Sequence, residues 1–232
     1  MAKLQVCPTR SNLPYLARCI AGQYSCFFRP TVFSGTLQVL LPVLRNQLCP
    51  ATPQAALKIA VVGCSAGEEV YSLATGLAQQ NLFSRVELRG IDRDPELVIQ
   101  ASRGSYRFSN YDGRLAFFSA VPQGCAKYFV VSKEDPDLFM IDPLIKKKIA
   151  FQKADATDSL FPELVQPQDV IIINNVLVHL PPKFQRSAID NIVAVLNPGG
   201  RLITDTPVTH PNLASGSFKS MVHSYLRRAD KK

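Results

Sequence analysis

The sequence predicts an α/β fold built on a doubly wound parallel sheet, and three observations support this prediction. Short apolar runs of strand length alternate with segments whose apolar residues recur at helical spacing. The run 169–174 ("DVIIIN") is apolar on both alternating faces, as expected of a strand covered on both sides. The 232 residues, 47% of them hydrophobic, suffice for one such domain with a small appendage.

The expected elements begin with a helical segment. Residues 31–48 have helical spacing but contain Pro42, which should interrupt the helix. Residues 49–54 form a turn or linker with two prolines, and "NPGG" (197–200) forms a later turn. Strands are expected at 56–62, 86–91, 148–154, 169–174 and 201–205, with helices at 67–80, 94–103 and 183–196.

Residues 105–145 interrupt this alternation. The apolar runs "KYFVVS" and "LFMID" flank "KEDPD", a composition typical of a hairpin with Pro136 in its turn. We therefore expect a small β insertion on the doubly wound core. The whole chain would then comprise an N-terminal helical segment (1–48), a main domain (55–226) and a basic tail (227–232).

Charge and cysteine usage narrow the class of protein. The chain has 26 Lys+Arg against 18 Asp+Glu, a formal net charge of +8. Basic runs such as 146–148 are more often solvated faces than nucleic-acid surfaces, so a nucleic-acid acceptor is kept only as an alternative. Six cysteines lack a C-x-x-C pair and metal-like spacing, and no long apolar span occurs. We expect a cytoplasmic protein with reduced thiols, no metal and no membrane segment.

The stretch "GCSAGEEVYS" (63–72) follows the first expected strand and opens the next helix. A turn that binds phosphate keeps negative charge away from its free N–H groups, yet this turn carries Glu68 and Glu69. It therefore suits a ligand that is cationic or rich in hydroxyl and amine donors. We expect Glu69 to face that ligand and Glu68 to stabilise the first turn of the helix.

Polar residues follow other strand ends, where ligands of open α/β sheets bind. They are Asp92, Asp155 and the pair Asn174–Asn175. Asp92 lies 25 residues after Gly67, near the offset at which a carboxylate meets ribose hydroxyls, although it could instead share the N-cap of the next helix with Asp94. The turn lacks G-x-G-x-x-G, so a nicotinamide dinucleotide is poorly supported. A ribose and adenine with a positive centre in place of phosphates describes S-adenosylmethionine.

Six motifs of the chain occur in the order found in a known family. They are "SCFFRP" (25–30), "GCSAGEEVYSLA" (63–74), "GIDRDPELVIQASRGSY" (90–106), "AKYF" (126–129), "NNVLVHL" (174–180) and "VLNPGGRLI" (195–203). Over roughly residues 23–226 the chain thus resembles chemotaxis receptor glutamate methyltransferases of the CheR type. The resemblance implies a Rossmann-like class I methyltransferase fold that uses S-adenosylmethionine and releases S-adenosylhomocysteine. Most of the family's N-terminal recognition module is expected to be missing.

The resemblance also implies a cofactor site drawn from several segments. Its members are Gly63, Cys64 and Glu69 from the first turn, Asp92 and Arg93 on the ribose side, Asp155 and Ala156 at the adenine, Gln23, Ser25 and Arg29 from the N-terminal segment, and Asn175 and Val176 near the methyl group.

Several positions depart from the family pattern. Asn174 stands where the family has arginine, and His179 stands where it has tyrosine. Asp155 replaces a more common asparagine, and Gln23 and Ser25 match the family's asparagine and threonine only loosely. These departures leave the cofactor expectation intact but leave the identity of the acceptor open.

The implied reaction is methyl transfer to a carboxylate, of a protein glutamate or a small acid. A glutamate with a reference pKa near ~4.3 needs no base, so the enzyme must align and desolvate it. Arg29 is the expected catalytic residue that holds the acceptor in a fork.

Alternatives to this reaction remain open. His179, with a reference pKa near ~6.5, could donate to the acceptor or act as a base for a hydroxyl or amine. A non-catalytic domain that binds the cofactor and regulates a partner is a further alternative. Nothing in the sequence indicates an oligomeric state.

Overall fold

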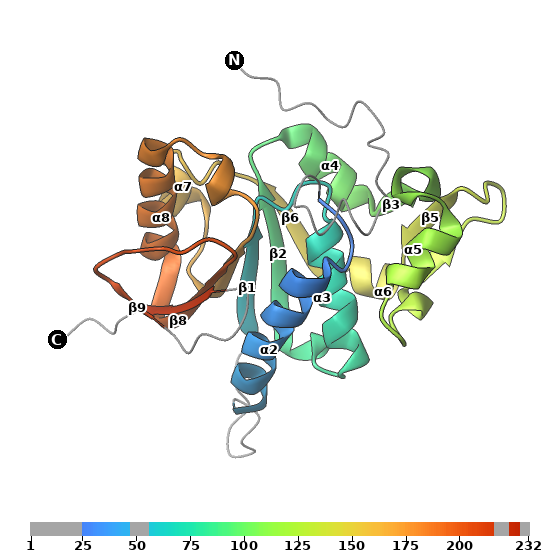
Figure 1. Ribbon diagram of the computed structural model, residues 1–232, viewed down its shortest axis with the longest axis horizontal. Coiled ribbons are helices and arrows are strands. Elements are labelled where there is room, and N and C mark those ends of the chain that lie inside the picture. The colour runs from blue at the N-terminus through green and yellow to red at the C-terminus, as the bar shows by residue number, and fades with distance from the viewer. Residues whose placement is uncertain (1–24, 47–55, 216–222, 228–232) are drawn as a thin grey trace.

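The computed structural model describes residues 25–46, 56–215 and 223–227 (Figure 1). Its larger sheet contains β1 (Leu57–Val62), β2 (Val86–Asp92), β6 (Ile149–Lys153), β7 (Gln168–Ile173), β8 (Leu196–Thr204), β9 (Leu213–Ser215) and β10 (His223–Arg227). The strand order is β6-β2-β1-β7-β8-β10-β9. The first five strands in this order are parallel, while β10 pairs antiparallel with β8 and β9. The predicted doubly wound α/β fold is confirmed.

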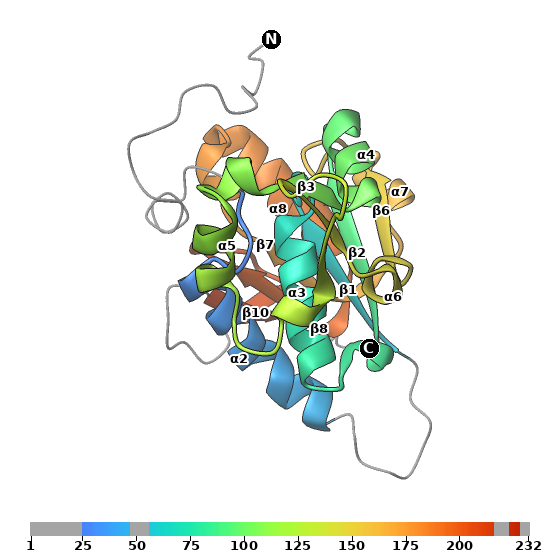
Figure 2. The same cartoon turned by 90° about the vertical axis from the view of Figure 1, so that its right-hand side faces the viewer.

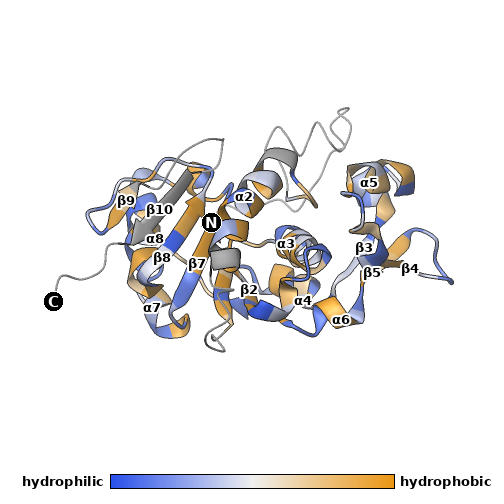
Figure 3. Ribbon diagram, turned by 90° about the horizontal axis from the view of Figure 1, so that it is seen from below, coloured by the Kyte–Doolittle hydropathy of each residue, from blue (hydrophilic) through white to orange (hydrophobic). Residues whose placement is uncertain are grey.

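Helices cover both faces of this sheet. They are α2 (Pro30–Asn46), α3 (Glu68–Gln79), α4 (Pro95–Arg103), α7 (Phe161–Leu164) and α8 (Pro182–Val195). The short helix α6 (Pro143–Lys146) packs against α3, and α5 (Arg114–Ala120) belongs to the insertion, where Phe117 joins the aromatic core. Ile59 and Val61 of β1 pack with α2 and α3 in one core, and Ala60 and Val62 pack with α7 and α8 in the other. The apolar colour of the central strands in Figure 3 follows from this double burial.

The insertion forms a second sheet of three strands. It contains β3 (Ser105–Arg107), β4 (Phe129–Val131) and β5 (Leu138–Ile141), in the order β3-β5-β4. β4 and β5 are antiparallel and are joined through "KEDPD", where the hairpin is predicted. The ring of Phe27 lies inside the aromatic core of this insertion, 5.0 Å from Tyr106 and 5.5 Å from Phe117 and Phe129. Figure 2 shows the segment that enters α2 passing beside α5.

Two local predictions are wrong. Helix α2 continues through Pro42, because the buried Leu40 and Leu44 on either side anchor the helix to the core and offset the missing N–H. The "NPGG" turn lies inside β8 rather than before it. Gln168 pairs with Leu196 and Val170 with Arg201, so residues 197–200 bulge out of the strand.

Two helices, α3 and α4, begin close to the carboxyl ends of the parallel strands β1 and β2, where ligands of such sheets bind. α3 begins directly after Gly67, whose φ of 93° is left-handed. Asp94 caps α4 by accepting a hydrogen bond from the Glu96 N–H, with Pro95 at the first helical position.

Among the described helices, none combines the length and apolar character that a membrane span requires.

Candidate functional site

The turn after β1 is held by backbone contacts with the end of β2. The N–H groups of Gly63 and Cys64 both donate to the Ile91 carbonyl, at 2.8 and 3.0 Å. Gly63, Ser65 and Gly67 all have left-handed φ values, 73°, 52° and 93°. Such alternation folds the chain tightly between strand and helix, and only glycine adopts it without cost.

Asp92, at the end of β2, fixes this turn. One carboxylate oxygen accepts from the Ser65 N–H at 2.8 Å, and the other accepts from the Asp94 N–H at 3.0 Å. Asp94 is the N-cap of α4, and Asp92 supports this helix start by accepting from the Asp94 N–H. An ionised carboxylate has about four acceptor positions. Asp92 therefore keeps capacity for a ligand hydroxyl while it supports the turn.

Gly63 and Val176 come together from different parts of the chain. A Cβ added at Gly63 would meet Cγ2 of Val176 at 2.2 Å, closer than any real contact. The loop after β7 therefore lies directly against the first turn, as a shared cofactor site requires. Cys64 is buried beneath the turn, and burial together with the nearby Asp92 carboxylate raises the pKa of its thiol.

The Glu68 side chain reaches well beyond its own helix. Its carboxylate accepts hydrogen bonds from the Ser25 hydroxyl at 2.9 Å and the Tyr111 hydroxyl at 3.3 Å. It is only 7% exposed, and burial raises its pKa. Glu68 is therefore more than a helix-stabilising charge, because it joins the N-terminal segment to the insertion.

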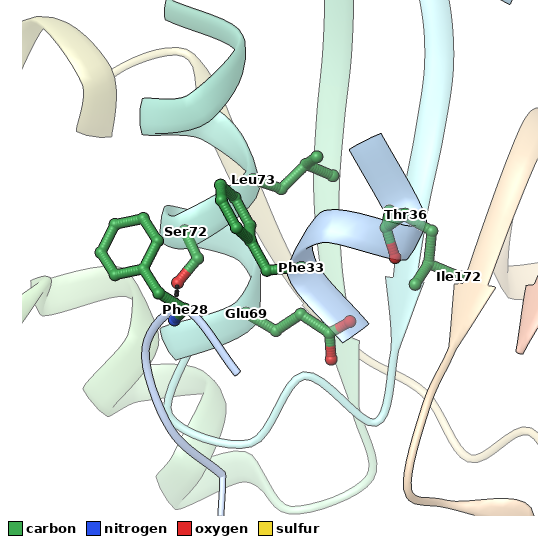
Figure 4. Close-up of a pocket in the computed structure, with 7 residues that line it drawn as sticks. All are labelled: Phe28, Phe33, Thr36, Glu69, Ser72, Leu73 and Ile172. Carbon is green, nitrogen blue, oxygen red and sulfur yellow. Dashed lines mark hydrogen bonds between the residues drawn. The ribbon is translucent and has the colours of Figure 1, made fainter. Parts of the chain in front are cut away.

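Glu69 is paired with the end of β7. The Asn174 amide donates to the Glu69 carboxylate at 2.6 Å, while the Asn174 amide oxygen is buried without a partner among the described residues. Burial raises the pKa of Glu69, and Asp205 adds to this effect. A cavity of about 20 Å³ adjoins Glu69, roughly the size of one water molecule. It is lined by Phe28, Phe33, Thr36, Glu69, Ser72, Leu73 and Ile172 (Figure 4).

Arg29 brings positive charge to this group of carboxylates. Its guanidinium lowers the pKa of both Glu68 and Glu69, although burial outweighs it in each case. Arg29 thus lies near the first turn of α3, where a cationic side chain can hold an acceptor carboxylate.

Asp205 is a site residue that the sequence reasoning missed. One of its carboxylate oxygens accepts from the Asn175 N–H at 2.7 Å. Asn175 has a left-handed φ of 56°, which asparagine tolerates better than most residues. The signal was available, because Asp205 directly follows β8 just as Asp92 ends β2.

An open hollow lies between the ends of β2 and β6, and one of the two expected adenine residues, Asp155, lines it together with Arg93 from the expected ribose side. Ala156, the other expected adenine residue, does not line it and is buried in the core. The Asp155 carboxylate also accepts from the Thr157 N–H at 2.9 Å, which fixes its orientation. Its full lining is Arg93, Asp94, Pro95, Lys153, Ala154, Asp155, Asp158 and Leu164.

Two further residues predicted for the site are His179 and Gln23. His179 lies exposed in the short helix η4 (Leu177–His179), on the same loop as Asn175 and Val176. Gln23 lies outside the described residues.

These residues fit S-adenosylmethionine. At Gly63 the backbone approaches Val176 so closely that only glycine fits, and the Asp92 carboxylate can accept hydrogen bonds from ribose hydroxyls. Glu69 and the unpartnered oxygen of Asn174 offer acceptors to an ammonium group. The donor set therefore agrees with a ligand that is positively charged at one end and a nucleoside at the other.

Comparisons with known proteins agree with this geometry. The family described as "CheR methyltransferase, SAM binding domain" matches residues 25–206. A Pseudomonas putida protein named as the methyltransferase Cher3 is 28% identical over 162 residues, covering 64% of this chain and 53% of the relative. Chemotaxis protein methyltransferase 1 of Pseudomonas aeruginosa is 25% identical over 181 residues, covering 76% of this chain and 62% of the relative. The chain therefore spans between half and two thirds of the length of these relatives.

A solved structure supports the fold alone. The crystal structure of the DszA carbon methyltransferase matches with a TM-score of 0.53 at 13% identity, covering 86% of this chain and 54% of that one.

Proposed function

Because this chain belongs to the CheR methyltransferase family through its SAM-binding domain, we propose that it methylates a carboxylate oxygen of its acceptor. Its cofactor is S-adenosylmethionine, as the sequence predicts. The bound cofactor supplies a methyl group activated on a sulfonium. The observation that carries the proposal is the backbone path that brings Arg29 to the start of α3: the Phe28 N–H donates to the Ser72 hydroxyl at 2.8 Å, and the Arg29 carbonyl accepts from the Phe33 N–H at 2.8 Å. The charge of Arg29 also acts on Glu68 and Glu69, whose pKa values it lowers.

Each side chain has a distinct task in this reaction. Arg29 holds the acceptor carboxylate in a fork and fixes which oxygen faces the methyl group. Glu69, with Asn174, receives the cationic end of the cofactor. The contact between Gly63 and Val176 closes the turn against the β7 loop and excludes water there. No base is required, because a carboxylate acceptor is already ionised at neutral pH.

A screen with labelled cofactor tests the proposal. Small carboxylic acids and glutamate-containing receptor-like peptides are offered to the wild-type protein and to Arg29→Ala and Arg29→Lys. We expect a base-labile methyl ester from the wild type, with about 100-fold lower kcat/KM in Arg29→Ala, since misplacement of the acceptor alone costs this much. Undiminished ester formation by Arg29→Ala would refute the role of Arg29. Cofactor binding without turnover of any acceptor would favour a non-catalytic regulatory domain.

The balance of charge favours a second candidate, methylation of an amine or hydroxyl. Asn174 brings an uncharged amide to Glu69 where the family pattern has arginine, and Asp205 raises the pKa of Glu69 further. A site rich in carboxylates receives a neutral or cationic acceptor more readily than an anionic one. Such an acceptor must lose a proton, for which His179 is the candidate base.

The variant His179→Phe separates the two candidates. A carboxylate acceptor should lose no more than about 10-fold in kcat, the cost of one hydrogen bond donated by His179, because no proton is removed. An amine or hydroxyl acceptor should lose about 10²–10⁴-fold in kcat, the usual contribution of a general base.

A further inference from the structure

The N-terminal segment is hydrogen-bonded to the first two turns of α3 at two points. The Ser25 hydroxyl donates to the Glu68 carboxylate at 2.9 Å. Three residues later, the Phe28 N–H donates to the Ser72 hydroxyl at 2.8 Å (Figure 4). Ser72 in turn donates to the Glu68 carbonyl at 2.7 Å. The hydroxyl of Ser72 therefore both accepts and donates, and it links the segment before Arg29 to the backbone of α3.

Phe28 is held in a conformation that it would not adopt alone. Its φ of 50° lies in the left-handed region, which for a bulky residue marks real strain that the surrounding structure must support. Phe28 is 3% exposed, and its ring packs edge-on against Phe33 at 5.2 Å and Phe129 at 5.8 Å. The ring contacts anchor the side chain, and the Ser72 hydroxyl anchors the backbone.

This left-handed residue determines where its neighbours go. Phe27, just before it, enters the aromatic core of the insertion. Arg29, just after it, lies near Glu68 and Glu69, and its carbonyl accepts from the Phe33 N–H as α2 begins. A relaxed φ at Phe28 would turn the following residue in a different direction. Any group that stabilises the Phe28 backbone therefore controls the position of the Arg29 guanidinium.

We propose that Ser72 is a positioning residue, whose hydroxyl holds Phe28 in its left-handed conformation and thereby fixes Arg29 against the acceptor. The inference rests on the role of Arg29 in the proposed function. Ser72 is 2% exposed and acts through the segment before Arg29 rather than by contact with the acceptor. Its removal leaves the buried Phe28 N–H without a partner, which the strained backbone can relieve only by moving.

The test compares Ser72→Ala with a matched control, Thr75→Val. Thr75 is a buried hydroxyl one turn later on α3, and it donates to the Tyr71 and Ser72 carbonyls, inside the same helix. Both variants remove a buried hydroxyl from α3, but only Ser72→Ala disturbs the N-terminal segment. Hydrogen exchange of a peptide containing residues 25–33, measured on the full chain, reports this difference without any acceptor.

We expect exchange at Phe28 to accelerate at least 10-fold in Ser72→Ala and to stay unchanged in Thr75→Val. Equal acceleration in both variants would show a general loss of helix packing and overturn the proposal. Unchanged exchange in Ser72→Ala would overturn it as well. Urea unfolding of both variants, each with one cooperative transition, establishes that they fold.

A double-mutant cycle with Arg29→Ala separates this inference from the proposed function. Ser72→Ala should lower kcat about 10–100-fold in the wild-type background, the scale of a misplacement near 1 Å, and should have no further effect when Arg29 is already alanine. Additive losses would show that Ser72 does not act through Arg29. If Arg29→Ala itself leaves turnover unchanged, the proposed function fails instead, while the exchange result still decides whether Ser72 orders the segment.

Discussion

Two sides of the site are built in different ways. We call residues 63–69 and Asp92 the cofactor side, and residues 25–29, 174–176 and Asp205 the acceptor side. The cofactor side is set by the path of the backbone, with its glycine turn bonded to the end of β2. The acceptor side is assembled by contacts between remote segments, such as Asn174 to Glu69 across 105 positions.

The two kinds of construction differ in how readily their residues can be substituted. A turn fixed by backbone hydrogen bonds tolerates few substitutions, because glycine and a carboxylate are each required by geometry. Side-chain contacts between remote segments can be exchanged one at a time. Asn174 departs from the family pattern on the acceptor side, and His179 departs from it three residues beyond that side on the same loop. Residues 63–69 and Asp92 retain the motif, whereas Asp155, at the expected adenine end, departs from it as well.

The largest expected effect is that of Gly63→Ala on the cofactor side. The new Cβ would meet Val176 at 2.2 Å at a residue with φ 73°, and we expect about 1–3 kcal/mol from backbone strain and about 1–3 kcal/mol more from overpacking. Urea unfolding and titration with S-adenosylhomocysteine measure the loss. Gly199→Ala is the control, since its φ is 77° but nothing lies within 4 Å of the added Cβ. Equal losses in both variants would rule out the Val176 contact as the cause.

Asp92→Ala should have the next largest effect. The left-handed Ser65 loses the acceptor of its N–H, and the ribose loses its carboxylate, so cofactor affinity should fall by about 1–3 kcal/mol. Calorimetric titration measures this change. Asp142→Ala, which removes a similar cap from the start of α6 outside the site, should leave the affinity unaltered. A wild-type affinity in Asp92→Ala would contradict the assignment of this residue.

Asp205→Ala should lower turnover rather than cofactor affinity, the opposite of what is expected for Asp92→Ala. Asn175 loses the partner of its N–H and has a strained φ of 56°, so the loop that carries Val176 should loosen. We expect about 1 kcal/mol less transition-state stabilisation, seen in kcat, with cofactor affinity nearly unchanged. Faster hydrogen exchange across residues 174–180 gives a second measure. A loss confined to cofactor affinity would place Asp205 on the cofactor side instead.

The smallest expected effect concerns the pH dependence of stability. Burial raises the pKa of the Glu68 carboxyl above 4.5, its value in the unfolded chain. The folded state therefore binds the proton of Glu68 more tightly, so the contribution of Glu68 to stability is fully present below pH 4.5 and is lost as pH rises through the folded pKa. Glu68→Gln should flatten this decline in urea titrations. The control Glu134→Gln removes an exposed carboxyl whose pKa is lowered by Ser132, so it should not flatten it.

Much of the fold was predictable, because it depends on local patterns. Alternating apolar runs located five parallel strands to within a few residues, except at β8. Its strand begins at Leu196 because residues 197–200 bulge within the pairing with β7. The break predicted at Pro42 is absent because tertiary packing decides there too: burial of Leu40 and Leu44 outweighs the local cost of a proline inside α2.

The site was predictable where the chain itself makes the geometry. Gly63, Glu69 and Asp92 stand at strand ends that the sequence locates, and the structure brings them together. Contacts of Glu68 with Ser25 and Tyr111 could not be inferred, because they depend on how the insertion folds back over α3. Spacing along the sequence carries no information on such contacts.

The burial of Phe27 inside the insertion has a consequence for folding during synthesis. Synthesis runs from the N-terminus, so this ring leaves the ribosome long before Tyr106, Phe129 and Phe139, which surround it in the finished fold. Until β5 has been translated, a large apolar group of the nascent chain has no native cover. Truncated chains that end before residue 139 should therefore aggregate or engage chaperones, and the insertion completes the burial of the N-terminal segment.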